Sequence, residues 1–121
     1  MKPAEPAVTV YGIANCDTVK KARAWLAERG IDCVFHDYKK LGVPLAPLER
    51  WMQSVGWEML INRKGTTWRK LDADQQAAVH DAASARELML AQPSVIRRPV
   101  LEHPGGLLVG FDADEWGRAL G

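Results

Sequence analysis

The feature that most constrains the fold is a strand–helix–strand pattern in the first third of the chain. Residues 8–13 read VTVYGI, a short β-branched and aromatic run typical of a buried strand. From Asp17 to Arg29 apolar and alanine positions recur at helical spacing, and Gly30 can end that helix in the left-handed conformation. Residues 31–38 return to an extended pattern. This unit predicts two parallel strands joined by a right-handed crossover.

The remainder of the chain predicts a helical block and then a second pair of strands. Residues 44–63 and 72–93 have helical composition with no strand pattern between them, and we expect a helical insertion at about 46–92. Residues 99–103 and 107–111 flank a PGG turn, which predicts a hairpin with Gly105 and Gly106 at positive φ. Residues 112–120 follow as a helix capped by Asp112 or Asp114.

The order βαβ, helical block, ββα predicts the fold class. It is an α/β chain with a mixed four-stranded sheet in the thioredoxin-like arrangement, interrupted by a helical insertion. We expect one domain over residues 8–121, since about 45 helical residues rarely hold a core alone. Residues 1–7, with two prolines, are expected to form a flexible lead-in.

Composition narrows the class of partners. The 121 residues carry a formal charge of +1 and are 47% hydrophobic, which is typical of an ordinary globular protein and argues against binding to nucleic acid or an anionic membrane. No apolar run approaches the roughly 20 residues that cross a bilayer. Two cysteines and three scattered histidines have no zinc spacing. We expect a monomeric cytoplasmic protein with reduced thiols and no metal.

Cys16 lies in the connection between the first predicted strand and the first predicted helix. A cysteine there is either a small apolar filler or a reactive thiolate. The unpaired N–H groups of the first helical turn and the helix dipole favour an anion at this position. Lys20, four residues later, is placed to add a positive charge. We therefore interpret Cys16 as the candidate nucleophile.

Three segments together carry a family resemblance. YGIANCDTVKKARAWL, INRKGTTWRKL and SVIRRPVL occur in order within residues 8–120, nearly the whole chain. They resemble the ArsC-related family, which includes glutaredoxin-coupled arsenate reductase, the Spx regulators and the YffB-like proteins. The YffB-like branch is the most similar, through CDTVKKA and GTTWRKL.

The resemblance implies a site. Cys16 matches the family's redox cysteine, and Arg98-Pro99 matches an Arg-Pro step with a cis proline beside that cysteine and the arginine facing the anion. Arg98 is the second catalytic candidate, and the neighbouring Arg97 is interpreted as solvated. The predicted residues for binding substrate or glutathione are Asn15, Lys20, Arg63, Arg98 and Pro99.

Departures from the family pattern limit the activity that the resemblance implies. Arsenate reductase has an arginine where this chain has Asn62, with Arg63 one place later, and another where it has Phe111. Arsenate is doubly charged, and each missing charge-assisted hydrogen bond is worth about 1.5–3 kcal/mol. We therefore expect no efficient arsenate reduction. The basic run at residues 63–70 is interpreted as a solvated turn, with contact to an acidic partner or a glutathione carboxylate as the alternative.

If Cys16 forms a disulfide with its substrate, a second thiol is needed to release it. Val19 stands where a C-x-x-C switch would have its second cysteine, and Cys33 is interpreted as a buried filler, with a resolving role as the alternative. The resemblance to YffB-like proteins implies glutathione as co-substrate, with no tightly bound cofactor. The predicted function is a glutathione-dependent thiol–disulfide oxidoreductase acting on a small-molecule or protein disulfide. The alternative is an Spx-like regulatory module that binds RNA polymerase or a protease adaptor.

Overall fold

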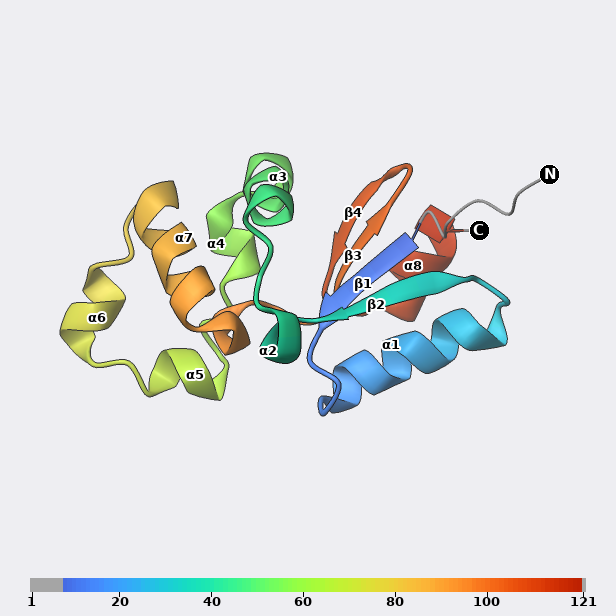
Figure 1. The fold of residues 1–121 in the computed structure, drawn as a ribbon, viewed down its shortest axis with the longest axis horizontal. Coiled ribbons are helices and arrows are strands. Elements are labelled where there is room, and N and C mark those ends of the chain that lie inside the picture. The colour runs from blue at the N-terminus through green and yellow to red at the C-terminus, as the bar shows by residue number, and fades with distance from the viewer. Residues whose placement is uncertain (1–7, 121) are drawn as a thin grey trace. The chain divides into compact units, whose positions relative to one another are not determined.

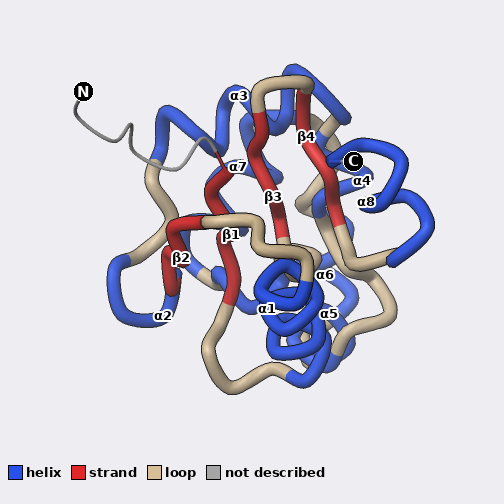
Figure 2. The backbone as a smooth tube through the Cα atoms, turned by 90° about the vertical axis from the view of Figure 1, so that its right-hand side faces the viewer, coloured by secondary structure: helices blue, strands red, loops and turns tan. Residues whose placement is uncertain are grey.

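The two ends of the chain meet in one four-stranded sheet. The computed structural model describes residues 8–120, so the predicted lead-in at 1–7 lies outside the described residues. Strands β1 (Val8–Gly12), β2 (Cys33–Asp37), β3 (Val100–His103) and β4 (Gly106–Val109) are arranged in the order β2-β1-β3-β4 (Figure 2). β1 is parallel to β2 and antiparallel to β3, and β3 is antiparallel to β4. The predicted mixed sheet and thioredoxin-like fold are confirmed.

Helices α1 (Asp17–Glu28) and α8 (Ala113–Leu120) contribute to the core on one face of this sheet. Alternation along the strands turns Val10 and Leu101 toward that core, where they meet Leu26 of α1 and the fully buried Trp116 of α8. Trp116 also donates from its indole nitrogen to the Gly110 carbonyl, 3.1 Å away. The C-terminal helix is therefore held by burial and by a directed hydrogen bond.

The predicted helix ends are largely confirmed. Gly30 has φ +68°, and the bonds Gly30 N to Ala27 O (3.1 Å) and Ile31 N to Leu26 O (3.0 Å) close the end of α1 as a Schellman motif. Asp112 is the cap of α8, since its carboxylate accepts from Glu115 N at 3.0 Å. In the hairpin turn Gly106 has φ +147°, whereas Gly105 is not among the described glycines with positive φ.

The segment from Tyr38 to Arg97 forms a second compact unit, distinct from the unit of the chain's two ends (Figure 1). Its core includes Tyr38, Leu48, Trp51, Leu60 and Met89, all at most 1% exposed. Its helices are α2 (Tyr38–Leu41), α3 (Leu45–Val55), α4 (Trp57–Leu60), α5 (Thr66–Arg69), α6 (Ala73–Ala77), α7 (Ala82–Ala91) and the 3₁₀ turn η1 (Pro93–Val95).

This helical unit is wider than the predicted range 46–92. The extended pattern predicts that Tyr38 continues the second strand, but it begins α2 and is buried within the helical unit. At the other end, Ile61 and Ile96 form an isolated antiparallel bridge that ties η1 back to the end of α4. Because these contacts join residues far apart in the sequence, the local pattern does not reveal them.

A close approach at Gly12 connects the end of β1 to α1. A Cβ on Gly12 would lie 2.9 Å from one γ-carbon of Val19, a fully buried side chain. Valine in a helix has little χ1 freedom with which to yield. We therefore expect Gly12→Ala to destabilise the protein by about 1–3 kcal/mol, measured by urea unfolding.

The double variant Gly12→Ala/Val19→Ala is the matched control for this prediction. It should be more stable than the sum of the two single effects indicates, because the smaller side chain makes room for the new methyl group. Simple additivity would show that the contact between residues 12 and 19 is not the cause.

Candidate functional site

The candidate site lies at one end of the sheet. In the parallel pair, Gly12 is in register with Asp37 at the last position of both strands. In the antiparallel pair, Tyr11 faces Val100, the first residue of β3. The residues that follow β1 and those that precede β3 therefore emerge at the same edge. Cys16 comes four residues after Gly12, and Arg98-Pro99 comes directly before Val100, so the topology brings the predicted site residues to one edge.

Cys16 is the N-cap residue of α1. It has extended backbone angles (φ −140°, ψ 124°), and its carbonyl accepts from Lys20 N at 2.9 Å. In the part of the chain that the structure describes, its side chain makes no capping hydrogen bond, and the residue is half-buried. The sulfur is thus carried by the N-cap residue. The unpaired N–H groups of the first helical turn follow directly after this residue and favour an anion there.

The Arg98-Pro99 peptide bond is cis, as the resemblance implies. Pro99 is buried, and its carbonyl accepts from Gly110 N at 2.8 Å, which joins the start of β3 to the turn after β4. Gly110 has φ +77°, a conformation that disfavours other residues there. Nearby, Tyr11 donates to Glu102 at 2.8 Å across β1 and β3. The Arg98-Pro99 step is therefore held in a well-bonded sheet edge, and Arg98 is half-buried.

The other predicted binding residues fall into two groups. Asn15 and Lys20 are exposed and flank Cys16, in the loop and in the first turns of α1. Arg63 belongs to the helical unit, where its guanidinium lies 6.0 Å from the Trp57 ring and 5.8 Å from the Trp68 ring. Its predicted contact with substrate stays a prediction.

The two positions where arsenate reductase has arginine are used structurally here. The Asn62 side chain accepts from Lys64 N at 3.2 Å, and its carbonyl accepts from Gly65 N at 3.1 Å, so it organises a turn. Phe111 packs edge-on against Trp116 (4.9 Å between centroids) and Trp25 (6.1 Å). Its position contributes an aromatic ring to the core, with no charge for an oxyanion.

Arg97, which is predicted to be solvated, makes an exposed side-chain hydrogen bond to the end of α4. Its backbone N–H donates to Leu60 O at 2.7 Å and its Nε to Met59 O at 2.9 Å, both at the C-terminal end of α4. Arginine bound to the last carbonyls of a helix satisfies groups that would otherwise lack a partner. The local sequence does not predict these hydrogen bonds of Arg97, because its partners lie 37 and 38 residues away.

Cys33 lies at the opposite end of the sheet from Cys16. It pairs with Val8, and the four residue-to-residue steps from Val8 to Gly12 span about 13 Å. Figure 1 shows α1 running along the sheet as it connects β1 to β2. A disulfide requires Cα atoms within about 7 Å, so Cys33 is not placed to resolve Cys16 in this fold. Both cysteines are free thiols.

The environment of Cys33 disfavours its thiolate form. Burial raises the pKa of the Cys33 thiol, while Arg23 lowers that pKa and Asp32 raises it by smaller amounts. Since alkylation requires the thiolate, we expect Cys33 to react with iodoacetamide only at higher pH than an ordinary cysteine, measured by mass mapping against pH. Arg23→Ala should shift that profile further upward and Asp32→Asn should shift it downward. Ordinary reactivity at Cys33 would contradict this account.

Neither a metal centre nor a membrane span is found within residues 8–120. Over this range no group of three or more histidine, cysteine or acidic side chains is placed to hold a metal ion. Among the helices described, none has both the length and the apolar character needed to cross a bilayer.

Relatives of known sequence share nearly the whole chain. A protein of Haemophilus influenzae described as uncharacterized is 40% identical over 113 residues, which is 93% of this chain and 98% of its own. The regulator Spx of Listeria innocua is 30% identical over 120 residues, covering 93% of this chain and 86% of its own.

Two solved structures are similar along the same length. A structure described as the YFFB protein has a TM-score of 0.88 and 53% identity, covering 94% of this chain and 99% of its own. An arsenate reductase (ArsC) related protein from Brucella melitensis has a TM-score of 0.74 and 55% identity, covering 98% of each. The model of the ArsC family matches residues 11–119. The chain therefore belongs to the ArsC family and is similar to its YffB-like members.

Proposed function

We propose that the protein is a glutathione-dependent thiol–disulfide oxidoreductase with Cys16 as its nucleophile. The observation that carries the proposal is Cys16 at the N-cap of α1, on the sheet edge where the cis Arg98-Pro99 step begins β3. A thiolate at a helix N-terminus is stabilised by the first-turn N–H groups and by the helix dipole. Membership in the ArsC family supports thiol chemistry of this kind.

The proposed cycle is a pair of exchange reactions. The Cys16 thiolate attacks one sulfur of a disulfide R–S–S–R, forms a mixed disulfide and expels the other half as a thiolate, which takes a proton from water. A glutathione thiolate attacks the substrate sulfur and frees Cys16. A second glutathione reduces the resulting R–S–S–glutathione. Two glutathione thiols thus supply two electrons, giving two R–SH and one oxidised glutathione.

External glutathione is required because the chain offers no second thiol within reach. Cys33 begins β2 opposite Val8, at the end of the sheet away from Cys16, and Val19 occupies the position that would complete a C-x-x-C pair. Two substitutions also disfavour arsenate as substrate, since Asn62 organises a turn within the helical unit and Phe111 belongs to an aromatic cluster beside the sheet.

Arg98 is proposed to face the anion formed at Cys16. We expect Arg98→Ala to lower kcat/KM for a glutathione mixed disulfide by about 10- to 100-fold, the effect of losing one charge-assisted hydrogen bond. Arg98→Lys should lie between, since it keeps the charge and loses the planar fork. Arg97→Ala is the matched control: it should lower stability, because it removes the bond to Met59 O, and leave kcat/KM near wild type. Equal loss in both alanine variants would argue against a specific role for Arg98.

The test of the function is covalent trapping together with turnover. Incubation with oxidised glutathione, followed by peptide mapping, should place a single glutathione adduct on Cys16. Reduction of the mixed disulfide of glutathione and mercaptoethanol, followed by glutathione reductase and NADPH, should show turnover that depends on glutathione concentration. If neither the adduct nor the turnover were observed, the proposed oxidoreductase function would be refuted.

The Spx relatives favour one alternative. The 30% identity with an Spx of similar length supports a regulatory module that docks on RNA polymerase. Stoichiometric capture of purified RNA polymerase, together with no thiol turnover, would favour the regulatory module over the enzyme.

A further inference from the structure

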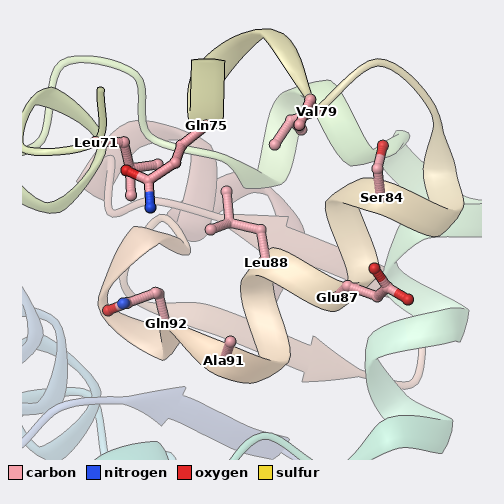
Figure 3. Close-up of a pocket in the computed structure, with 9 residues that line it drawn as sticks. Leu71, Gln75, Val79, Ser84, Glu87, Leu88, Ala91 and Gln92 are labelled. Carbon is pink, nitrogen blue, oxygen red and sulfur yellow. The ribbon is translucent and has the colours of Figure 1, made fainter. Parts of the chain in front are cut away.

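An open hollow in the helical unit is not used by the proposed chemistry. It has a volume of about 370 Å³, and Leu71, Val79 and Leu88 point toward one another at its centre (Figure 3). Pockets of roughly 300–1,000 Å³ are typical of binding sites. The full lining is Leu71, Gln75, Ala78, Val79, Ser84, Glu87, Leu88, Ala91 and Gln92.

A second, more polar hollow of about 440 Å³ adjoins the first. The two share Leu71, Gln75 and Gln92, and the second adds Thr67 and Lys70. Lys70 is the charged residue among the five that line it. An apolar recess and a recess that is lined by a lysine therefore share part of their walls.

Gln75 contributes a hydrogen-bond donor at the end that the two hollows share. Gln75 Oε1 accepts from Asp72 N at 3.0 Å, which leaves the Gln75 amide nitrogen as the donor of that side chain. Ser84, at the other end beside Glu87 in Figure 3, uses its hydroxyl on His80 N, Asp81 N and Asp81 itself. A ligand group near Lys70 would therefore meet donors and a cation, which suits a carboxylate.

The walls of the two hollows are locally braced. Gln75 and Ser84 belong to the capping boxes of α6 and α7, paired with Asp72 and Asp81. Hydrogen bonds from the backbone and side chain of Ser84 hold the pKa of the Asp81 carboxyl below its ordinary value, so the box at α7 stays formed well below neutral pH. Gln76 Nε2 also donates to Trp68 O at 2.9 Å, which ties α6 to α5. A braced surface loses little entropy on binding.

The segment that contributes Thr67 and Lys70 to the second hollow carries further positive charge. Residues 63–70 contain Arg63, Lys64, Arg69 and Lys70 and no acidic residue, and all four cations are exposed. A single small carboxylate would engage one of these charges. A chain carrying several carboxylates would engage more of them, and apolar anchors in recesses commonly dominate such interfaces.

We propose that these hollows bind an acidic peptide segment of a protein partner. One large apolar side chain of the segment fills the recess between Leu71, Val79 and Leu88, and its flanking carboxylates lie toward Lys70 and toward Arg69 of α5. Glu87 at the opposite end disfavours the reverse placement. This site is independent of Cys16 and of the proposed thiol exchange.

The test uses the full chain and a defined peptide. A fluorescein-labelled twelve-residue peptide with a central Leu-Phe pair, flanked by Asp and Glu, is titrated with the protein and followed by fluorescence anisotropy. Lys70→Glu should weaken binding about tenfold or more, whereas Lys40→Glu, an exposed lysine on α2, should leave it unchanged. Cys16→Ser should bind as wild type does.

A second peptide separates the anchor from the charge. Replacing Leu-Phe by Ser-Ser should abolish most binding to the wild-type protein, and amide shifts in an NMR titration should centre on Leu71, Gln75, Val79 and Leu88. Three results would each overturn the proposal. The first is equal binding of both peptides, and the second is equal weakening of binding in both lysine variants. The third is saturation of the hollows by octanoate without displacement of the peptide.

Discussion

Replacing Cys16 by serine should abolish glutathione-dependent disulfide reduction. The hydroxyl of serine is a far weaker nucleophile than a thiolate and forms no disulfide, so the expected loss in kcat is on the order of a thousandfold or more. Stability should change little, because Cys16 is only half-buried and its side chain caps no described backbone group. The measurement is turnover of the glutathione–mercaptoethanol mixed disulfide, with urea unfolding in parallel.

Cys33→Ser is the matched control, since it removes the other thiol from the same chain. Cys33 begins β2 opposite Val8, at the end of the sheet away from Cys16, and burial raises the pKa of its thiol, so the variant should keep nearly full activity. Loss of activity in Cys33→Ser with activity retained in Cys16→Ser would reverse the assignment. Loss in both would indicate a cycle that uses both thiols, in conflict with their separation across the sheet.

Introducing arginine at position 111 should not create an arsenate reductase. Phe111 is one ring of a cluster with Trp25 and Trp116, so the substitution replaces aromatic packing by a charge among apolar groups. We expect Phe111→Arg to lower the free energy of unfolding by about 2–3 kcal/mol, measured by urea denaturation, with no glutathione-dependent reduction of arsenate.

Phe111→Leu is the control that keeps an apolar side chain. It should cost less, because leucine still covers Trp116, although the edge-on ring contact is lost. If Phe111→Arg were as stable as the wild type and reduced arsenate, the side chain at position 111 would have to face the thiol site, and its assignment to the core would be wrong.

Membership in the family does not settle which of its reactions a chain performs. Cys16 lies at the N-cap of α1 and the Arg98-Pro99 bond is cis. Asn62 and Phe111, in contrast, make structural contacts at the positions where the resemblance implies arginine in arsenate reductase. The proposed selectivity for disulfides over a doubly charged oxyanion follows from these two substitutions.

Local patterns in the chain are enough to predict most of its elements. The strand at residues 8–12, the helix from Asp17, its Gly30 terminus and the C-terminal hairpin follow from periodicity, turn residues and capping, which act over a few neighbouring residues. The position of Cys16 at a helix N-terminus follows from the same short range. The cis state of Pro99 required the family resemblance, because an isolated Arg-Pro step favours trans.

Only the tertiary structure decided which of these residues meet. Strand register placed Cys33 opposite Val8, at the other end of the sheet from Cys16. Packing placed Phe111 in an aromatic cluster. Arg97 found carbonyl partners 37 and 38 residues away, and the bridge between Ile61 and Ile96 helped to extend the helical unit beyond its predicted bounds. Each outcome depends on contacts between distant segments, whose free energy exists only once the chain has closed around them. The sequence by itself therefore determined the elements and the candidate nucleophile, and the folded chain decided what surrounds them.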